Sequence, residues 1–206
     1  MHSTTTLATE IKSQTAIKTH SVWGTAIRFT IVTTVLLGLA YPLAVTGVAG
    51  LLFPHKAAGS LILKDGQIIG SELLAQSFTA DKYFHPRPSA AGNGYDATAS
   101  GGSNLAQSNQ TLVTRIQGSI DKLAQENPGH PVPIDLVTTS GSGLDPDITP
   151  DAAYFQVPRV AKARKLSEDQ LNKLIAQQTT PRQLGLLGEP RVNVLDLNLA
   201  LDNLSR

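Results

Sequence analysis

Residues 29–54 form a run of 26 residues that contains no Asp, Glu, Lys, Arg or His. As an α-helix rising about 1.5 Å per residue, the run would be roughly 39 Å long, which exceeds the ~30 Å hydrocarbon core of a bilayer. A Ser- and Thr-rich tail precedes it and a polar region follows it. The sequence therefore predicts a cytoplasmic tail without stable structure over residues 1–24, one transmembrane helix over 25–54 and an exported domain over 55–206.

Two other interpretations of this run remain open, although we favour a retained span. A cleaved secretory signal has an apolar region of about 7–15 residues that ends at small residues. Here the run is longer, and Pro54, His55 and Lys56 separate it from Ala57. The other alternative is a buried core helix of a soluble protein. The chain has no Cys, which excludes a lipoprotein anchor, disulfides and thiolate metal sites.

The charges that flank the run predict its orientation. Lys12, Lys18 and Arg28 precede it, whereas only Lys56 and Lys64 occur in the twenty residues after it. Because Lys and Arg tend to remain on the cytoplasmic side, the N-terminus is expected inside and the domain outside.

Small or kinking residues recur at intervals of four within the run. Residues four apart lie on one ridge of a helix, and small side chains on that ridge let a second helix approach closely in lipid. We therefore predict a helix-packing ridge, although such residues are also common in membrane helices in general. Its members, which follow Thr30, are Thr34, Gly38, Pro42, Thr46 and Gly50.

The region after the run predicts a mixed α+β domain. Asp65-Gly66 between short apolar segments indicates a β-hairpin, and residues 76–109 form a long irregular segment. An amphipathic helix is expected from Gln110, capped by Ser108 or Asn109. Residues 132–137 are expected to be extended, with a strand as one alternative, and to lead into a turn at 140–143.

Local signals also predict the remaining helices of the domain. Thr149 caps a helix that begins at Pro150 and stops or kinks at Pro158. Ser167 and Gln170 form a capping box for the next helix. Residues 192–204 are read as a short strand followed by a helix.

Residue chemistry alone gives no catalytic site. The serines of 140–143 lack the glycine spacing of a nucleophile elbow. Asp145, Asp147, Thr149 and Asp151 are spaced like early calcium ligands, but Pro150 stands at the sixth position, so turn and capping roles are favoured. The domain carries 14 Lys and Arg against 15 Asp and Glu, which gives no basic surface for nucleic acid.

Sequence stretches spread over residues 25–203 nevertheless match one family in order. They include Tyr83-Phe84-His85-Pro86-Arg87-Pro88-Ser89, Ser100-Gly101-Gly102-Ser103-Asn104-Leu105, Ser140-Gly141-Ser142-Gly143-Leu144-Asp145-Pro146, Val157-Pro158-Arg159-Val160-Ala161, Gly188-Glu189-Pro190-Arg191-Val192-Asn193-Val194 and Asn198-Leu199-Ala200-Leu201-Asp202. In these stretches the chain resembles the KdpC family, the C subunit of bacterial Kdp potassium-transporting ATPases. Ala106-Gln107 and Asp147 depart from the family pattern.

The resemblance implies a subunit of an inner-membrane complex that uses ATP to take up K⁺. Its partners would be a channel-like K⁺-selecting subunit, a P-type ATPase subunit and a small single-span subunit. The family member has been described as a catalytic chaperone that raises the ATP affinity of the ATPase subunit, which makes Ser100, Gly101, Gly102 and Gln156 weak candidates for nucleotide contact. No cofactor or metal is expected to bind this chain directly.

The predicted orientation conflicts with direct nucleotide contact, because ATP lies inside the cell and the domain outside. We therefore expect a non-catalytic accessory subunit whose domain caps the outer mouth of the K⁺-selecting subunit. The alternative is a free-standing, membrane-anchored binding protein. Residues expected to support assembly or loop structure are Tyr83, His85, Arg87, Asn104, Asp145, Arg159 and Arg191.

Overall fold

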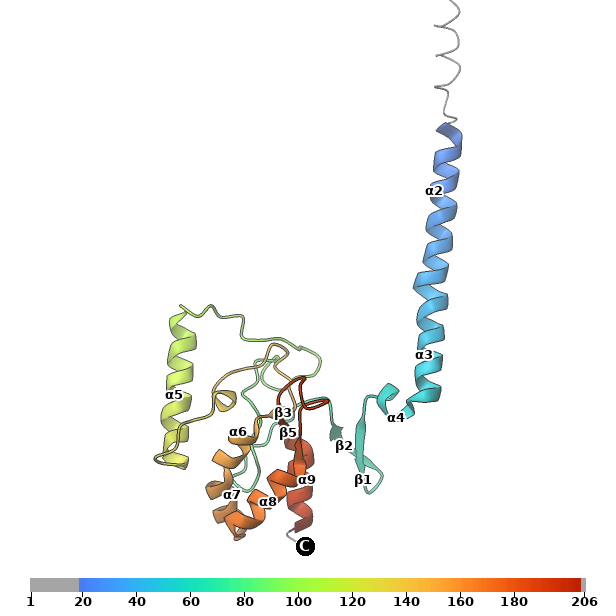
Figure 1. Cartoon of the computed structure of the whole chain (residues 1–206). Coiled ribbons are helices and arrows are strands. Elements are labelled where there is room, and N and C mark those ends of the chain that lie inside the picture. The colour runs from blue at the N-terminus through green and yellow to red at the C-terminus, as the bar shows by residue number, and fades with distance from the viewer. Residues whose placement is uncertain (1–18, 205–206) are drawn as a thin grey trace, which may run out of the picture. The chain divides into compact units, whose positions relative to one another are not determined.

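The computed structural model describes residues 19–204, and these divide into two units. One unit extends to Ala58 and the other begins at Gly59. Figure 1 shows the helices and strands of each unit. The predicted tail lies largely outside the described residues.

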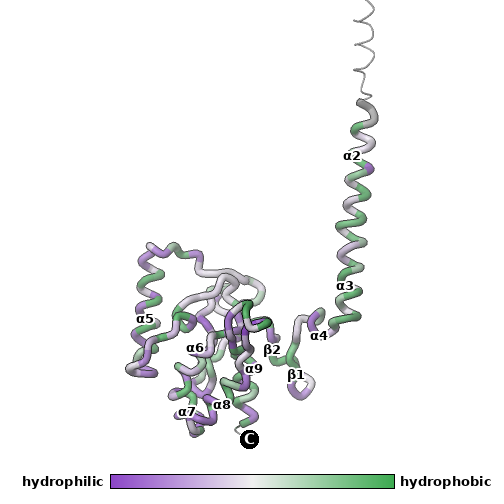
Figure 2. The backbone as a smooth tube through the Cα atoms, viewed as in Figure 1, coloured by the Kyte–Doolittle hydropathy of each residue, from purple (hydrophilic) through white to green (hydrophobic). Residues whose placement is uncertain are grey.

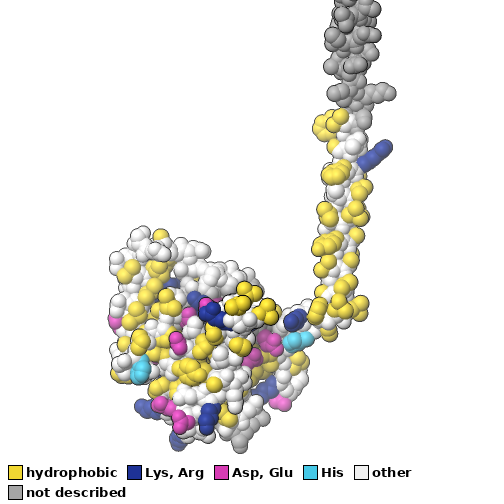
Figure 3. All heavy atoms as spheres, viewed as in Figure 1, with side chains coloured by type: hydrophobic (Ala, Val, Ile, Leu, Met, Phe, Trp, Pro, Cys, Tyr) yellow, Lys and Arg dark blue, Asp and Glu magenta, His cyan; other side chains and the backbone are white. Residues whose placement is uncertain are grey.

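The first unit contains one long apolar helix. It comprises α2 (Thr19–Thr33), the π-helical segment η1 (Thr34–Ala40) and α3 (Tyr41–Leu52). An 18-residue window within the helical stretch Val22–Leu52 has a mean hydropathy of 2.0, and none of the described side chains of η1 or α3 is buried. Hydrophobic residues run along most of its length (Figure 2), and Figure 3 shows hydrophobic side chains along its visible face. The predicted N-terminal apolar helix is thus confirmed, although it begins before residue 25.

The π-helical segment has a local cause in Pro42. Proline has no N–H, and its ring clashes with the carbonyl four residues earlier, so the turn before it must change. The N–H of Tyr41 donates to the carbonyl of Leu36, five residues back. A π-helical turn contains more residues than an α-helical turn. Residues four apart therefore stay more nearly in line along the helix. The packing ridge stays a prediction.

The apolar helix ends at Leu52, because the φ of −136° at the C-cap Phe53 leaves the helical region. The single turn α4 (Pro54–Ala57) follows. Strands β1 (Leu61–Lys64) and β2 (Gln67–Ser71) then form an antiparallel hairpin with Lys64 opposite Gln67. Asp65 and Gly66 have φ values of 53° and 77°, which confirms the predicted turn.

The predicted irregular segment is confirmed, because residues 76–109 contain no helix or strand. Helix α5 (Gln110–Glu126) follows, and Asn109 is its cap because the Asn109 side chain accepts from the Thr111 N–H. No residue of α5 is buried, so its apolar face is only partly covered.

The strand predicted within residues 132–137 is wrong. This segment contains the 3₁₀ turn η2 (Ile134–Leu136), which follows Pro133. The Asp135 side chain is buried and accepts from the Thr149 N–H at 2.8 Å. This contact holds the turn against the start of α6, and β3 (Asp147–Ile148) pairs in the sheet instead.

A small sheet and four helices build the core. In the sheet, β5 (Arg191–Asn193) lies between β3 and β4 (Thr179–Thr180), antiparallel to both. The helices are α6 (Pro150–Phe155), α7 (Val157–Arg164), α8 (Glu168–Gln178) and α9 (Val194–Leu204). The core includes Phe84, Val160, Leu171, Ile175, Val192, Leu197 and Leu201.

The caps of these helices agree with the sequence. Thr149 accepts from the Ala152 N–H at the start of α6, and the Ser167–Gln170 capping box opens α8. The break between α6 and α7 falls at Gln156, just before Pro158. The strand and helix predicted at the C-terminus are also confirmed.

Candidate functional site

The irregular segment is held to the core by two buried amide side chains. The Asn198 amide on α9 accepts from the Phe84 N–H at 2.8 Å and donates to the Phe84 carbonyl at 2.9 Å. The Gln156 amide accepts from the His85 N–H at 2.7 Å and donates to the His85 carbonyl at 3.1 Å. The backbone N–H and carbonyl groups of Phe84 and His85 are therefore paired as they would be beside a neighbouring β-strand. Their partners are side-chain amides instead of backbone groups.

This double clamp places the Phe84 side chain in the core, where it is completely buried. Asn198 and Gln156 are each only 2% exposed. A buried amide that lost these partners would leave polar groups unpaired, so the clamp fixes one position of the segment.

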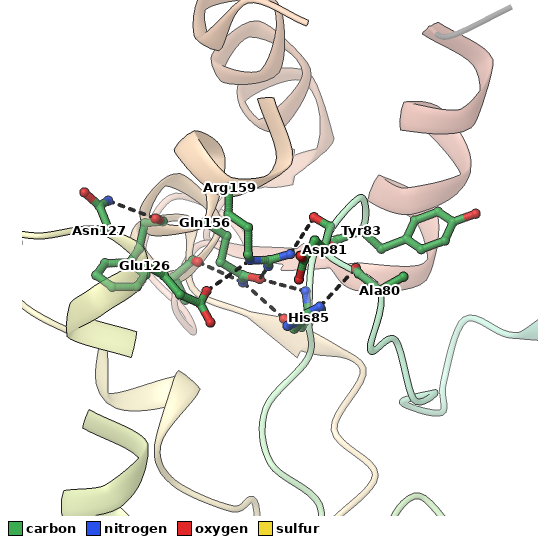
Figure 4. Close-up of polar contacts among 10 residues, drawn as sticks. Ala80, Asp81, Tyr83, His85, Glu126, Asn127, Gln156 and Arg159 are labelled. Atoms are coloured by element: carbon green, nitrogen blue, oxygen red, sulfur yellow. Dashed lines mark hydrogen bonds and ion pairs between the residues drawn. The ribbon is translucent and has the colours of Figure 1, made fainter. Parts of the chain in front are cut away.

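Arg159 on α7 joins the clamp to α5 and to the preceding loop (Figure 4). Its guanidinium donates to the Glu126 carboxylate at 3.0 Å and to the Gln156 side-chain oxygen at 2.7 Å. It also donates to the backbone carbonyls of Asp81 and Tyr83, at 2.7 and 2.9 Å. Burial lowers the pKa of Arg159, and the Glu126 carboxylate opposes that shift. The fork geometry of arginine suits such a junction.

His85 lies within this junction, and its ring nitrogen Nε2 is 3.2 Å from the Ala80 carbonyl. Burial lowers the pKa of His85 below its usual value, and the positive charge of Arg159 lowers it further. The neutral imidazole is therefore the favoured form in the folded protein.

Tyr83 packs on the other side of the clamp. Its hydroxyl donates to the Asp202 carboxylate at 3.3 Å, and Asp202 also pairs with Arg164 at 2.6 Å. The Arg164 guanidinium carbon lies 4.8 Å from the Tyr83 ring centroid, within cation–π range. α9 is thereby tied to α7 through the irregular segment.

Arg87 and Asp145 form a second cluster. Their side chains pair at 3.1 Å, and Arg87 also donates to the Thr138 hydroxyl at 3.3 Å. The Tyr95 hydroxyl donates to the Arg87 carbonyl at 2.8 Å, and burial raises the pKa of Tyr95. This cluster closes the loop after Arg87 on itself.

The three loop residues proposed for nucleotide contact pack against the turn at 140–143. The Gly101 N–H donates to the Ser142 carbonyl at 2.8 Å, and the Ser100 hydroxyl donates to the same oxygen at 3.0 Å. A Cβ on Gly102 would lie 3.2 Å from the Gly141 carbonyl oxygen. These glycines permit close backbone packing, and the fourth candidate, Gln156, is engaged in the clamp.

The remaining sequence-predicted residues lie elsewhere in the domain. Arg191 pairs with Asp147 at 3.0 Å, next to the β3–β5 pairing. Among the residues with calcium-like spacing, Asp145 accepts from the Asp147 N–H in a turn and Thr149 caps α6. Asn104 is exposed and has a φ of 51°.

The structure thus brings Tyr83, His85, Gln156 and Arg159 into one junction, and Arg87 and Asp145 into another. Sequence reasoning missed Asn198, Glu126 and Arg164. One signal for Asn198 was present, because this polar residue is four positions after Val194 on the apolar face of α9.

A cavity of about 600 Å³ opens beside residues 130–134 and the starts of α6, α7 and α8. Val132, Ile134, Tyr154 and Val157 contribute to its lining, which is mainly apolar. Thr149 and Asp151, which have calcium-like spacing, line it, but none of the residues predicted for assembly or nucleotide contact does.

Comparison with known proteins decides the family. The family model described as "KdpC: K+-transporting ATPase, c chain" matches residues 23–203. The chain belongs to the KdpC family.

Several curated KdpC proteins are similar over most of their length. The potassium-transporting ATPase KdpC subunit of Acidobacterium capsulatum is 59% identical over 181 residues, which cover 87% of this chain and 97% of that protein. The KdpC subunit of Methylobacterium nodulans is 58% identical over 184 residues, covering 84% and 92%. That of Koribacter versatilis is 56% identical over 178 residues, covering 86% and 92%. The family identified from the loop sequences is confirmed.

Proposed function

We propose that this KdpC chain is a non-catalytic accessory subunit of an ATP-driven potassium uptake complex in the bacterial inner membrane. The main support for the proposal is that the residues considered for nucleotide contact form hydrogen bonds to other parts of the domain. Both ends of the Gln156 amide are engaged by neighbouring groups of the chain, and Ser100 and Gly101 bond to the 140–143 turn. Their polar groups already have partners, which favours a scaffolding role.

In this proposal the chain acts by assembly and coupling. The apolar helix associates with membrane helices of a channel-like K⁺-selecting subunit, next to the P-type ATPase subunit and a small single-span subunit. The exported domain caps the outer mouth of the K⁺-selecting subunit. Any effect on ATP affinity is then a coupling free energy transmitted through the complex.

The proposal is tested by purifying the complex with and without this chain and measuring ATP hydrolysis. We expect K⁺-stimulated hydrolysis to require the chain. A photoreactive ATP analogue should label the ATPase subunit and leave this chain unlabelled. Recovery of the chain alone from its membranes would favour the free-standing binding protein.

Matched variants distinguish coupling from nucleotide contact. Ser100→Ala removes the hydroxyl that donates to Ser142, and Ser103→Ala is its control in the same loop. We expect both complexes to keep the wild-type KM for ATP. A raised KM in Ser100→Ala alone, together with labelling of this chain, would contradict the proposal.

The orientation can be tested directly because the chain has no Cys. Single-cysteine variants Ser3→Cys and Asn203→Cys are treated in intact cells with a maleimide that cannot cross the inner membrane. We expect labelling at position 203 and protection at position 3. The reverse pattern would place the domain in the cytoplasm.

A further inference from the structure

The segment between β4 and β5 exposes three leucines at its tip. Leu184, Leu186 and Leu187 are 90%, 81% and 60% exposed. Single exposed leucines are common on protein surfaces, but three within four residues form a patch that requires an explanation.

This segment, residues 181–190, is an ordered hairpin. Gln183 and Leu187 exchange two backbone hydrogen bonds, each of 2.9 Å. Below them, Arg182 and Glu189 form an ion pair. The leucines therefore stand on a turn closed by the bridge between Gln183 and Leu187, which lies beyond the β4–β5 pairs.

The backbone conformation at the turn of this hairpin is unfavourable for leucine. Leu184 and Gly185 have φ values of 53° and 73°, the combination of a type I′ turn. At the first of these positions Asn or Gly is preferred, because a larger side chain is strained at positive φ. A leucine here serves neither the turn nor the core.

The short linker between the apolar helix and the domain indicates which surface the hairpin tip contacts. The apolar helix ends at Leu52 and the domain's first strand begins at Leu61. Eight intervening residues span at most about 30 Å even when fully extended. A domain of this size has a radius of gyration of only about 15 Å, so its surface stays close to the bilayer interface.

We propose that residues 184–187 insert into the outer leaflet of the bilayer and form a second membrane contact of the domain. The leucines enter the acyl boundary, and Arg182 and Arg191 at the base of the hairpin lie at the level of the lipid phosphates. The proposal rests on the membrane anchoring described above and is independent of potassium transport. A partner protein is the less favoured occupant, because leucine is under-represented among residues that dominate protein interfaces.

Tryptophan fluorescence of the full chain in vesicles tests this contact. The native Trp23 lies at the start of the apolar helix and is the chain's single tryptophan. A Trp23→Phe, Leu186→Trp variant moves that reporter to the hairpin, and Trp23→Phe, Val113→Trp places it on exposed α5 as a control. The vesicles contain phosphatidylethanolamine and phosphatidylglycerol, with or without brominated acyl chains.

We expect the reporter at position 186 to emit at shorter wavelength and to be quenched by brominated lipid, as native Trp23 is. The reporter at position 113 should be quenched by aqueous acrylamide. Adding Leu184→Asn to the position-186 reporter should weaken its lipid quenching while the domain remains folded.

Emission at position 186 that resembles position 113 would overturn the proposal. If the tryptophan at position 186 becomes protected from acrylamide only when the other subunits are added, and brominated lipid does not quench it, the proposal would be overturned in favour of a protein partner. Loss of lipid quenching at Trp23 would instead disprove the anchoring on which the proposal rests, so the two failures are distinguishable.

Discussion

Two connecting segments of the domain are built in opposite ways. Residues 76–109 have no regular structure, yet Phe84 is completely buried and the neighbouring backbone is paired by Asn198 and Gln156. Residues 181–190 form a short hairpin closed by the antiparallel bridge between Gln183 and Leu187, yet their leucines are exposed. Local backbone pairing and burial of side chains are thus independent properties of these segments.

The difference shows how each segment is stabilised. The first segment depends on partners distant in the sequence, since Phe84 and Asn198 are 114 positions apart. The second depends on contacts within about ten residues. Damage to distant partners should therefore destabilise the whole domain, whereas changes at the hairpin tip should have small effects on folding.

The largest expected effect comes from removing the buried ring. Phe84→Ala should reduce the free energy of unfolding by about 3–5 kcal/mol, because the ring fills the core and a cavity remains. Leu187→Ala at the exposed hairpin is the matched control and should change it by less than about 0.5 kcal/mol. Urea unfolding of the full chain in a mild detergent measures both. Similar losses for the two variants would remove the contrast between the segments.

Removing the Asn198 amide clamp should have the next largest effect on the free energy of unfolding. Asn198→Ala leaves the N–H and carbonyl of Phe84 without partners, at an expected loss of roughly 2–4 kcal/mol. Asn203→Ala, on the exposed side of α9, is the control and should be nearly neutral. If both alanine variants unfold at the same urea concentration, the clamp does not hold the segment.

Close packing of the loops can be probed at glycine. Gly143 has a φ of 68°, and a Cβ there would lie 2.5 Å from the Gly101 carbonyl oxygen. Gly143→Ala should destabilise the domain by roughly 2–3 kcal/mol, because strain and overlap add. Gly141→Ala meets no atom within 4 Å and should be tolerated. Thermal unfolding of the two variants provides the comparison.

The His85 junction predicts a pH dependence of stability. Because burial lowers the pKa of folded His85, the unfolded chain binds the proton more readily. The stabilising contribution is present above the ordinary value of 6.5 and is lost as pH falls below it through the folded pKa. His85→Gln should flatten the decline in melting temperature between neutral and mildly acidic pH. The control His130→Gln should retain it, and an unchanged decline in His85→Gln would contradict this account.

The smallest expected effect lies at the hairpin turn and has the opposite sign. Leu184→Asn should stabilise the domain by about 0.5–1 kcal/mol, because Asn tolerates the positive φ of a type I′ turn. Leu186→Asn lacks this benefit and should be neutral. A clear loss of stability in Leu184→Asn would show that the leucine supports the fold.

The amino-acid sequence by itself determined the apolar helix, the β1–β2 hairpin and the caps of α6 and α8, and it narrowed the cap of α5 to Ser108 or Asn109. Each depends on contacts within a few residues, such as Asp65-Gly66 or the Ser167–Gln170 pair. The loop sequences also identified the family, which the comparison confirmed.

Only the tertiary structure decided where the irregular segment lies and what its polar residues do. The strand expected in 132–137 was wrong because Asp135 pairs with the start of α6, a contact invisible to local periodicity. Gln156 was considered for nucleotide contact, but its amide pairs with His85, 71 positions away. Such pairing depends on which backbone groups remain unsatisfied after the core has packed, and that is a property of the whole fold.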